Sequence, residues 1–264
     1  MSDRAAKRSG PAPTPARHAV VTGGSRGLGA AIAGRLVAAG MHVTLMGRDE
    51  VALAAAQSEL GALQTVAVDV TDPDAVRDAF VRTVAEGGPV EVLVNNAGAA
   101  ESAPFERTGV DLLERLMAVN LRGTLLCSQA VLGGMREAGW GRIVNVASTA
   151  GLKGYAYVSA YCAAKHAVVG LTRALALETA RQGITVNAVC PGYADTEMTR
   201  RTLETIRDKT GRDLDEARAE LLRGNPQGRL VEPAEVAAAV AWLCDEASGA
   251  VTGQAIAVAG GEVP

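Results

Sequence analysis

The amino-acid sequence predicts one α/β domain built on a doubly wound, mostly parallel sheet of about seven strands, with helices on both faces. Short apolar runs alternate with amphipathic stretches along the chain, which is the order that right-handed strand–helix–strand crossovers require. Several runs are nearly continuous in Val, Ile, Leu and Ala, as in strands covered on both faces. Hydrophobic residues make up 48% of the 264 residues and aromatic residues only 3%, which favours helices packed closely on a sheet over a β-sandwich.

The alternation places the elements along the chain. The predicted strands are 18–22, 41–46, 63–68, 90–95, 141–147, 183–189 and 254–258. The predicted helices lie near 27–39, 49–60, 72–86, 109–137, 159–181 and 232–245. Two helix starts carry a capping residue followed by proline, at Asp72-Pro73 and Glu232-Pro233.

Two segments depart from this rhythm. Residues 1–16 are basic and proline-rich, lack the apolar stretch of a secretory signal, and are predicted to be a flexible tail. The rest, 17–264, is predicted to be a single dinucleotide-binding catalytic domain. Within it, residues 193–228 are highly charged and too long for an ordinary connection, so they are predicted to form a substrate lid.

Composition excludes several classes of function. The net charge is −3 with both signs interspersed, unlike the basic surface of a nucleic-acid binder. No uninterrupted apolar run approaches the roughly 18 residues of a membrane span. The four cysteines are far apart in apolar segments, which indicates buried free thiols rather than disulfides or a metal site. We therefore expect a soluble, cytoplasmic protein without a metal.

A glycine-rich loop follows the first strand and precedes the first helix. Glycines allow a tight turn and a close backbone approach, and the helix start offers N–H groups to a pyrophosphate. The loop predicts a dinucleotide site, although a plain glycine-rich turn is the alternative in a chain with 30 glycines. The candidate cofactor-binding residues here are Gly23, Ser25, Arg26, Gly27, Leu28 and Gly29.

A tyrosine and a lysine four residues apart suggest proton transfer. Tyr161 and Lys165 share one helix face, so their polar ends can converge. A nearby ammonium favours the phenolate, so we expect Lys165 to lower the pKa of Tyr161. Ser148 ends the fifth strand, at the sheet edge where open α/β folds place their sites. An exposed surface pair and a plain turn serine are the alternatives.

Further motifs complete a family pattern. Asn95-Asn96-Ala97-Gly98 follows the fourth strand, Asn120 lies in a long apolar helix, and Pro191-Gly192 follows the sixth strand. With the glycine loop, Ser148, Tyr161 and Lys165, this order resembles the short-chain dehydrogenase/reductase family from residue 18 onward. The resemblance is to its subgroup of about 250 residues, and most to 3-oxoacyl thioester reductases, and it implies a Rossmann-type fold.

The resemblance also implies roles. Tyr161 would be the general acid, Lys165 would also bind the nicotinamide ribose, Ser148 would hydrogen-bond the carbonyl, and Asn120 would hold a water that links the lysine to solvent. Asn95 would tie neighbouring strands together. The cofactor would further contact Asp69, Val70, Asn96, Ala97, Gly98, Tyr161, Pro191, Gly192 and Thr196. For Asp69 and Thr196, capping the following helix is the alternative role.

The end of the second strand bears on cofactor choice. An acidic residue there accepts from ribose hydroxyls, whereas arginine accommodates a 2′-phosphate. Here Gly47 and Arg48 occupy these positions and Arg26 adds a second positive charge, so NADP(H) is favoured over NAD(H). Asp49 leaves NAD(H) open if the strand ends one or two residues later.

The predicted function is an NADPH-dependent carbonyl reductase acting on a 3-oxoacyl thioester or a related ketone. The alternatives are an NAD(P)-linked secondary-alcohol dehydrogenase and a dinucleotide-sensing protein without turnover. A homodimer or homotetramer is expected, because helices 109–137 and 159–181 carry apolar or small residues around much of their circumference. One face would cover the sheet and the other would pack against a second copy of the chain. Ala259 stands where the family commonly has aspartate near a subunit interface, which weakens the case for a tetramer.

Overall fold

The seven strands form one parallel sheet in the order β3-β2-β1-β4-β5-β6-β7. The computed structural model describes residues 16–263, so the predicted tail lies, except for its last residue, outside the described residues. The strands are β1 (His18–Thr22), β2 (His42–Gly47), β3 (Gln64–Ala67), β4 (Val92–Asn95), β5 (Gly141–Val146), β6 (Ile184–Pro191) and β7 (Ala255–Val258). The predicted α/β fold is confirmed, and the strand bounds differ from the predicted ones by at most two residues.

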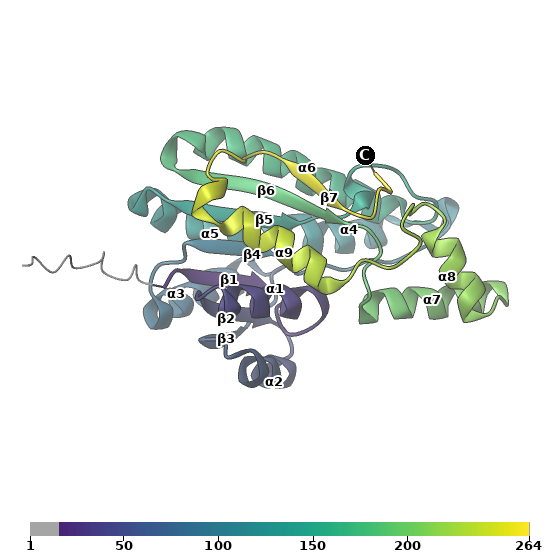
Figure 1. The fold of residues 1–264 in the computed structure, drawn as a ribbon, viewed down its shortest axis with the longest axis horizontal. Coiled ribbons are helices and arrows are strands. Elements are labelled where there is room, and N and C mark those ends of the chain that lie inside the picture. Colours follow the sequence, from purple (N-terminus) through teal and green to yellow (C-terminus); the bar gives the residue numbers. More distant parts are fainter. Residues whose placement is uncertain (1–15, 264) are drawn as a thin grey trace, which may run out of the picture.

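The sheet reverses its direction of growth beside β1. The chain adds β2 and β3 on one side of β1, then returns to its other side with β4 and continues outward to β7 (Figure 1). The crevice outside the carboxyl ends of β1 and β4 is where doubly wound sheets bind ligands. The glycine loop leaves β1 at this point, so the residues of the predicted dinucleotide site lie at this edge of the sheet.

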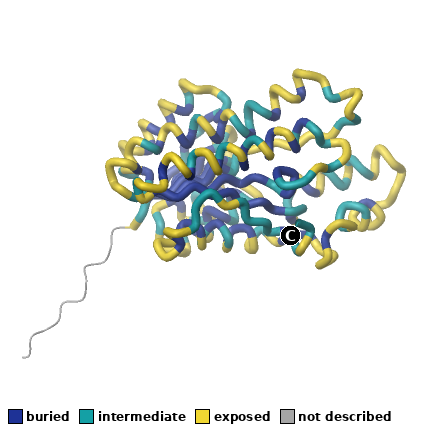
Figure 2. Tube along the Cα trace, turned by 90° about the horizontal axis from the view of Figure 1, so that it is seen from above, coloured by how far each residue is buried: buried dark blue, intermediate teal, exposed yellow. Residues whose placement is uncertain are grey.

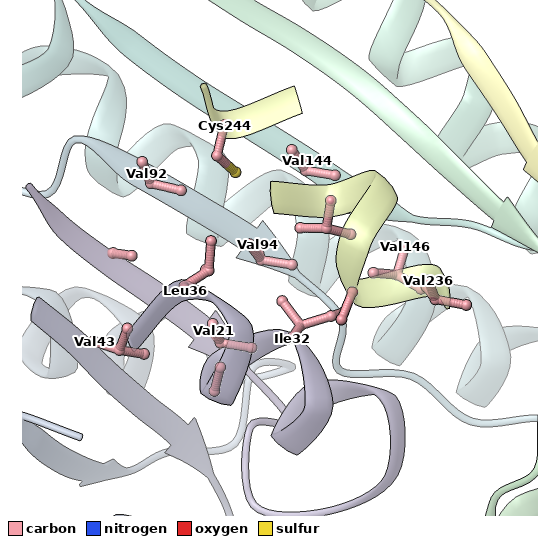
Figure 3. Close-up of a cluster of buried hydrophobic side chains, with 14 of the residues drawn as sticks. Val21, Ile32, Leu36, Val43, Val92, Val94, Val144, Val146, Val236 and Cys244 are labelled. Carbon is pink, nitrogen blue, oxygen red and sulfur yellow. The ribbon is translucent and has the colours of Figure 1, made fainter. Parts of the chain in front are cut away.

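Helices cover both faces of the sheet. They are α1 (Gly27–Ala38), α2 (Glu50–Leu60), α3 (Pro73–Gly87), α4 (Val110–Met117), α5 (Gly123–Ala138), α6 (Ser159–Thr179), α7 (Glu197–Thr210), α8 (Leu214–Leu222) and α9 (Pro233–Cys244). Helices α1 and α9 pack on one face, where Ile32, Leu36 and Val236 meet strand valines (Figure 3). Helices α3 and α5 cover the other face with Phe80, Val131 and other apolar residues.

Burial follows this layering. The strands run through the centre of the molecule as its most buried part, while the outer helix faces are exposed (Figure 2). Each fully buried Val, Leu or Ile contributes about 1.5–3 kcal/mol relative to an exposed one, so the two apolar layers supply most of the driving force.

A polar chain crosses the core between the two central strands. Asn95 of β4 donates from Nδ2 to Asn145 Oδ1 of β5 at 2.9 Å and is 3.1 Å from Ser128 Oγ of α5. Asn145 in turn donates to Thr172 Oγ1 of α6 at 2.8 Å. Because buried amide groups need hydrogen-bond partners, this series of side-chain hydrogen bonds holds β4, β5, α5 and α6 together. Asn95 has the strand-tying position that the sequence predicted.

The predicted helix 109–137 is interrupted. Helices α4 and α5 are joined by a π-helical segment, Ala118–Arg122, which inserts extra backbone into an otherwise continuous rod. The combined helix Val110–Ala138 is long and apolar enough to span a membrane, with mean hydropathy 1.2 in its most apolar window. Its apolar residues Cys127, Val131 and Met135 are buried against the sheet.

The segment 193–228 leaves the end of β6 and forms α7 and α8 beyond the carboxyl ends of the strands (Figure 1). Thr196 caps α7 by accepting from Thr199 N, and Asp213 forms a capping box with Glu216 at the start of α8. The chain before α7 and the chain after α8 lie side by side, because Ala194 and Val231 form a parallel bridge.

Candidate active site

The glycine loop is shaped by two left-handed glycines and one close contact. Gly23 and Gly27 have φ of 63° and 55°, which other residues rarely adopt. A Cβ on Gly29 would lie 2.0 Å from the carbonyl oxygen of Gly23, so only glycine fits there. Helix α1 begins after Arg26 without a side-chain cap, which leaves its first N–H groups available to an anion.

The neighbouring β4 loop braces the glycine loop. Asn96 donates from Nδ2 to the carbonyl oxygens of Thr22 and Gly23 at 3.0 and 3.1 Å. The N–H of Ala97 donates to Thr22 Oγ1 at 3.0 Å. The Asn96 side chain therefore holds the glycine loop in shape, and its contact with the cofactor stays a prediction. Ser25 is half-buried in the loop, and Leu28 packs against the core.

Ser148, Tyr161 and Lys165 come together at the carboxyl end of β5. The Ser148 hydroxyl accepts from Ala150 N at 3.1 Å and is hydrogen-bonded to Tyr161. Lys165 Nζ donates to the carbonyl oxygen of Val146 at 2.8 Å and lies 5.7 Å from the centroid of the Tyr161 ring. Lys165 is buried, at 5% exposure, which excludes the exposed surface pair.

The electrostatics of this cluster differ from the sequence prediction. Burial raises the pKa of Tyr161 to about 12, and the hydrogen bond with Ser148 only partly opposes it. Burial likewise lowers the pKa of Lys165 to about 8. The expectation that Lys165 lowers the pKa of Tyr161 is therefore wrong for this arrangement, because removal from water outweighs the attraction between the groups. The phenol keeps its proton at neutral pH.

Asn120 faces the same cluster from the π-helical segment. Its Nδ2 donates to the carbonyl oxygens of Ala99 and Leu116, each at 2.9 Å. Its Oδ1 is buried and has no hydrogen-bond partner among the described residues. A Cβ on Gly98 would lie 2.7 Å from this Oδ1 and 3.6 Å from Lys165 Nζ. An unpaired buried acceptor beside an ammonium is suited to a bridging water.

The two arginines predicted to select the cofactor follow neighbouring strands of the sheet. Arg26 and Arg48 are both exposed, one in the glycine loop and the other just after β2. Asp49 is the N-cap of α2 and accepts from Ala52 N at 3.0 Å. Since capping engages the carboxylate of Asp49 with its own helix, the alternative in which it receives a ribose hydroxyl loses support.

Asp69 and Val70 follow β3 on the same side. Asp69 Oδ1 accepts from the N–H and the hydroxyl of Thr71 at 2.9 and 2.8 Å. The backbone hydrogen bond from Thr71 is the main reason that the pKa of Asp69 is lowered, with a smaller effect of the Arg48 charge. Asp72, not Asp69, caps α3. Val70 is buried against Gly123.

The third wall of the crevice is the end of β6. Pro191 is the last residue of β6, and Gly192 lies beside Ala259 of the C-terminal segment. Thr196 packs over the glycine loop, since its Cγ2 lies 3.6 Å from where a Cβ on Gly27 would be. Thr196 therefore combines the capping role with a place beside the predicted pyrophosphate site.

Four further residues in this region were not predicted. Glu262 has a side chain only 5% exposed, lies 3.2 Å from Lys153 Nζ through Oε1, and receives a 2.6 Å hydrogen bond from Tyr155. The Tyr155 ring meets the Tyr193 ring edge-on at 6.4 Å. Glu262 comes after the last strand, where no local pattern reveals a long-range contact. In the sequence, only the closeness of Lys153 and Tyr155 to Ser148 could have indicated that these residues belong to the site.

The arrangement agrees with a comparison to known protein families. A model described as short chain dehydrogenase matches residues 17–207, which is most of the chain. The chain belongs to the short-chain dehydrogenase family. The resemblance seen in the sequence is confirmed, and with it the prediction that the protein is an oxidoreductase.

Relatives of this short-chain dehydrogenase match it over nearly its full length. An acetoacetyl-CoA reductase of Rhizobium meliloti (strain 1021) is 41% identical over 248 residues, covering 93% of this chain and 98% of the relative. A cis-4-hydroxycyclohexanecarboxylate dehydrogenase of Sinomonas cyclohexanicum is 42% identical over 250 residues, covering 93% and 96%. Among solved structures, a variant actinorhodin polyketide ketoreductase with NADPH matches with a TM-score of 0.90 at 40% identity, covering 94% of this chain and 97% of that one.

Proposed function

We propose that this short-chain dehydrogenase reduces a ketone with NADPH. The observation that carries the proposal is the convergence of Ser148, Tyr161 and Lys165 at the carboxyl end of β5, next to the glycine loop. A non-catalytic dinucleotide sensor has no need of two hydroxyl donors and a buried lysine at one point. The reductases among the relatives support the same conclusion.

The residues present fit a dinucleotide. The glycine loop packs closely on the start of α1, because Gly29 has no Cβ to meet the Gly23 carbonyl oxygen, and Gly98 likewise leaves space beside Lys165. Gly23, Gly27 and the start of α1 would hold the pyrophosphate, and Asp69 and Val70 the adenine side. Ala97, Gly98 and Lys165 would face the nicotinamide ribose, and Pro191, Gly192 and Thr196 its amide. When bound, NADPH supplies a hydride.

The chain's own groups then handle the oxygen of the ketone. Ser148 donates a hydrogen bond to it, and Tyr161 donates its proton to it as negative charge develops. The raised pKa of Tyr161 suits a proton donor, because the phenol stays protonated over the whole neutral range. Lys165 is held by the carbonyl oxygen of Val146, and Asn120 presents its unpaired Oδ1 for a water beside the ammonium.

Three observations support NADPH over NADH. Arg26 in the glycine loop and Arg48 just after β2 are exposed and would be available to a 2′-phosphate. The Asp49 carboxylate caps α2. The solved ketoreductase relative contains NADPH.

The substrate class is assigned as a 3-oxoacyl thioester or a related ketone. The acetoacetyl-CoA reductase at 41% identity supports the thioester. The 193–228 segment, our proposed lid, presents both charge signs and stands over the site. The dehydrogenase that acts on a hydroxycyclohexane carboxylate favours a cyclic secondary alcohol as the second candidate.

One assay separates these candidates. NADPH oxidation is measured with acetoacetyl-CoA, a cyclic ketone and a quinone, and NADP⁺ reduction with the corresponding alcohols. We expect turnover with the ketones and the best kcat/KM with acetoacetyl-CoA. Preference for the cyclic ketone selects the second candidate, and no turnover with any carbonyl or alcohol refutes an oxidoreductase function on these substrates.

The lowered pKa of Lys165 predicts a pH dependence. The ammonium is lost as the pH rises through about 8, while Tyr161 remains protonated to about 12. We therefore expect kcat/KM for NADPH to fall above about pH 8 and not to recover at higher pH, since this parameter reports the free enzyme. Lys165→Arg keeps its charge at all these pH values, so the decline near pH 8 should be absent from its profile, whatever its rate. A flat wild-type profile up to pH 10 would contradict this.

We also propose that the protein is a homodimer or homotetramer joined through α4, α5 and α6. Val110, Leu113 and Leu125 are exposed on α4 and α5, and Leu177 is 84% exposed on α6. We expect light scattering to give a multiple of 27.0 kDa at micromolar concentration, and Leu125→Glu to lower that mass. A wild-type monomer would refute the proposal.

A further inference from the structure

A short turn after β5 determines where Ser148 lies relative to α6. Ser148 is the N-cap of the 3₁₀ turn Thr149–Gly151, and its carbonyl oxygen accepts from Gly151 N at 2.8 Å. A Cβ on Gly151 would lie 2.7 Å from the carbonyl oxygen of Lys165, so the turn packs directly against α6 at that residue. A shift of this turn would therefore move Ser148 relative to both Lys165 and Tyr161.

Two hydrogen bonds lead from this turn to the C-terminal segment. Tyr155 Oη is 2.7 Å from Thr149 Oγ1 and 2.6 Å from Glu262 Oε1. A carboxylate only accepts and a phenol has one proton, so Tyr155 donates to Glu262 and accepts from Thr149. Burial, and then the hydrogen bond to Glu262, raise the pKa of Tyr155, so the phenol keeps its proton at neutral pH. The turn that follows Ser148 is thereby tied to Glu262.

Both ends of this connection are buried. Thr149 is 4% exposed, and the side chain of Glu262 is 5% exposed. Among the described residues, Tyr155 is the one side chain that hydrogen-bonds the Thr149 hydroxyl. Because a buried hydroxyl without a partner is unfavourable, removing the Tyr155 hydroxyl removes the reason for Thr149 to stay in this place.

The Glu262 end is held by its own contacts. After β7, Gly260 and Gly261 adopt φ of 60° and 89°, which turns the chain back. A Cβ on Gly260 would collide with the side chain of Asn225, so this turn packs against the chain that follows α8. Lys153 Nζ lies 3.2 Å from Glu262 Oε1 and donates to the Glu262 carbonyl oxygen at 3.4 Å. Glu262 is therefore a fixed point to which Tyr155 is attached.

We propose that Tyr155 is a positioning residue for Ser148: its hydroxyl ties the turn after Ser148 to the buried Glu262, and so holds the Ser148 hydroxyl where the ketone oxygen is received. This inference rests on the proposed reductase function and deepens it. Tyr155 acts through Ser148, so its own hydroxyl need not contact the ketone.

The test is a first-turnover measurement with acetoacetyl-CoA or the best ketone of the panel. Enzyme loaded with one equivalent of NADPH is mixed with saturating ketone. The rate constant of the first turnover reports the chemistry of intact sites, whereas its amplitude reports how many sites are intact. In Tyr155→Phe we expect the rate constant to fall about fivefold, the worth of one net hydrogen bond, with full amplitude. A merely structural role would lower the amplitude and leave the rate constant unchanged.

A second measurement shows whether the effect passes through Ser148. Removing one donor to a developing oxyanion costs about 10²–10³-fold, and the first turnover of Ser148→Ala can still be followed at such a rate. If Tyr155 acts through Ser148, adding Tyr155→Phe to Ser148→Ala should lower the rate constant no further. An independent contribution of Tyr155 would repeat the fivefold fall.

Further variants test each part of the connection. Thr149→Val removes the hydroxyl at nearly constant volume and should slow the first turnover as Tyr155→Phe does; it replaces Tyr155→Phe if that variant does not fold. Glu262→Gln keeps an acceptor oxygen and should keep the rate constant. In Glu262→Leu the Tyr155 proton turns to Thr149, its nearest other acceptor, so the attachment to the C-terminal segment is lost and the rate constant should fall. Tyr157→Phe makes the same chemical change at a tyrosine that is 68% exposed, and it should match the wild type.

The outcomes are distinct. A lower rate constant at full amplitude in Tyr155→Phe, with no further fall in the Ser148→Ala background, supports the proposal. A wild-type rate constant in Tyr155→Phe or in Glu262→Leu, or a repeated fall in the Ser148→Ala background, overturns it while the reductase function stands. A wild-type chain that reduces no ketone overturns both.

Discussion

Replacing Tyr161 with phenylalanine is expected to abolish ketone reduction while leaving NADPH affinity nearly unchanged. The ring and its packing against α4 are retained, so the loss falls on the hydroxyl that donates the proton. General acid catalysis contributes about 10²–10⁴-fold to a rate, and more where the same hydroxyl stabilises negative charge on oxygen. The measurements are kcat by NADPH oxidation and the NADPH dissociation constant by calorimetry.

Two controls accompany this variant. Tyr157→Phe changes a tyrosine in the loop just before α6 that is 68% exposed, and it should keep wild-type activity. Lys165→Ala should lose activity and NADPH affinity together, because in the proposed complex its ammonium would contact the ribose and also lies near the Tyr161 ring. If Tyr161→Phe retained activity within tenfold of the wild type, the proton donor would have to be another group.

The second large effect is a reversal of cofactor preference in Arg48→Asp. Charge-assisted contacts to phosphate are worth roughly 1.5–3 kcal/mol each, so two arginines imply about a hundredfold preference for NADPH over NADH, less where solvent screens them. An aspartate at position 48 would repel the 2′-phosphate and accept from the free ribose hydroxyls of NADH. We expect kcat/KM for NADPH to fall and that for NADH to rise, measured at low salt.

Arg35→Asp is the matched control for this variant. Arg35 is exposed in the last turn of α1, at the opposite end of the helix from the glycine loop, and its replacement changes the net charge equally. Its cofactor preference should stay that of the wild type. Equal or better use of NADH by the unmodified protein would mean that Arg48 does not hold a phosphate, without affecting the family assignment.

The pattern of apolar and polar residues in the sequence predicted every strand of the sheet, but it did not predict the interruption of the long helix. The strands are short, apolar and bounded by turns, so their positions follow from composition and alternation. Strand β6 runs to Pro191 rather than 189 because its last residues pair with β7, a partner that is distant in sequence. The π-helical segment around Asn120 was missed because one inserted residue barely disturbs a helical period in an apolar stretch.

The sequence predicted those residues of the candidate site whose positions follow from their spacing along one helix or strand. Tyr161 and Lys165 are four residues apart on one helix, and Ser148 closely follows a strand that must point to the same edge. The direction of the pKa shift of Tyr161 was wrong, because sequence spacing shows the neighbouring charge but not the depth of burial. Glu262 was missed for a related reason: its contacts with Tyr155 and Lys153 are set by the fold, more than a hundred residues away along the chain.

The buried cysteines allow local opening of the core to be measured by alkylation of their thiols. Cys127 lies in the apolar layer under α5 and Cys244 in the layer under α9, on opposite faces of the sheet. Burial raises the pKa of both thiols to about 12, so almost no reactive thiolate exists at neutral pH in the closed protein. Alkylation at each position therefore measures how often its layer separates from the sheet. Equal labelling rates would show that the two layers open as one cooperative unit, and unequal rates would identify the layer that yields first.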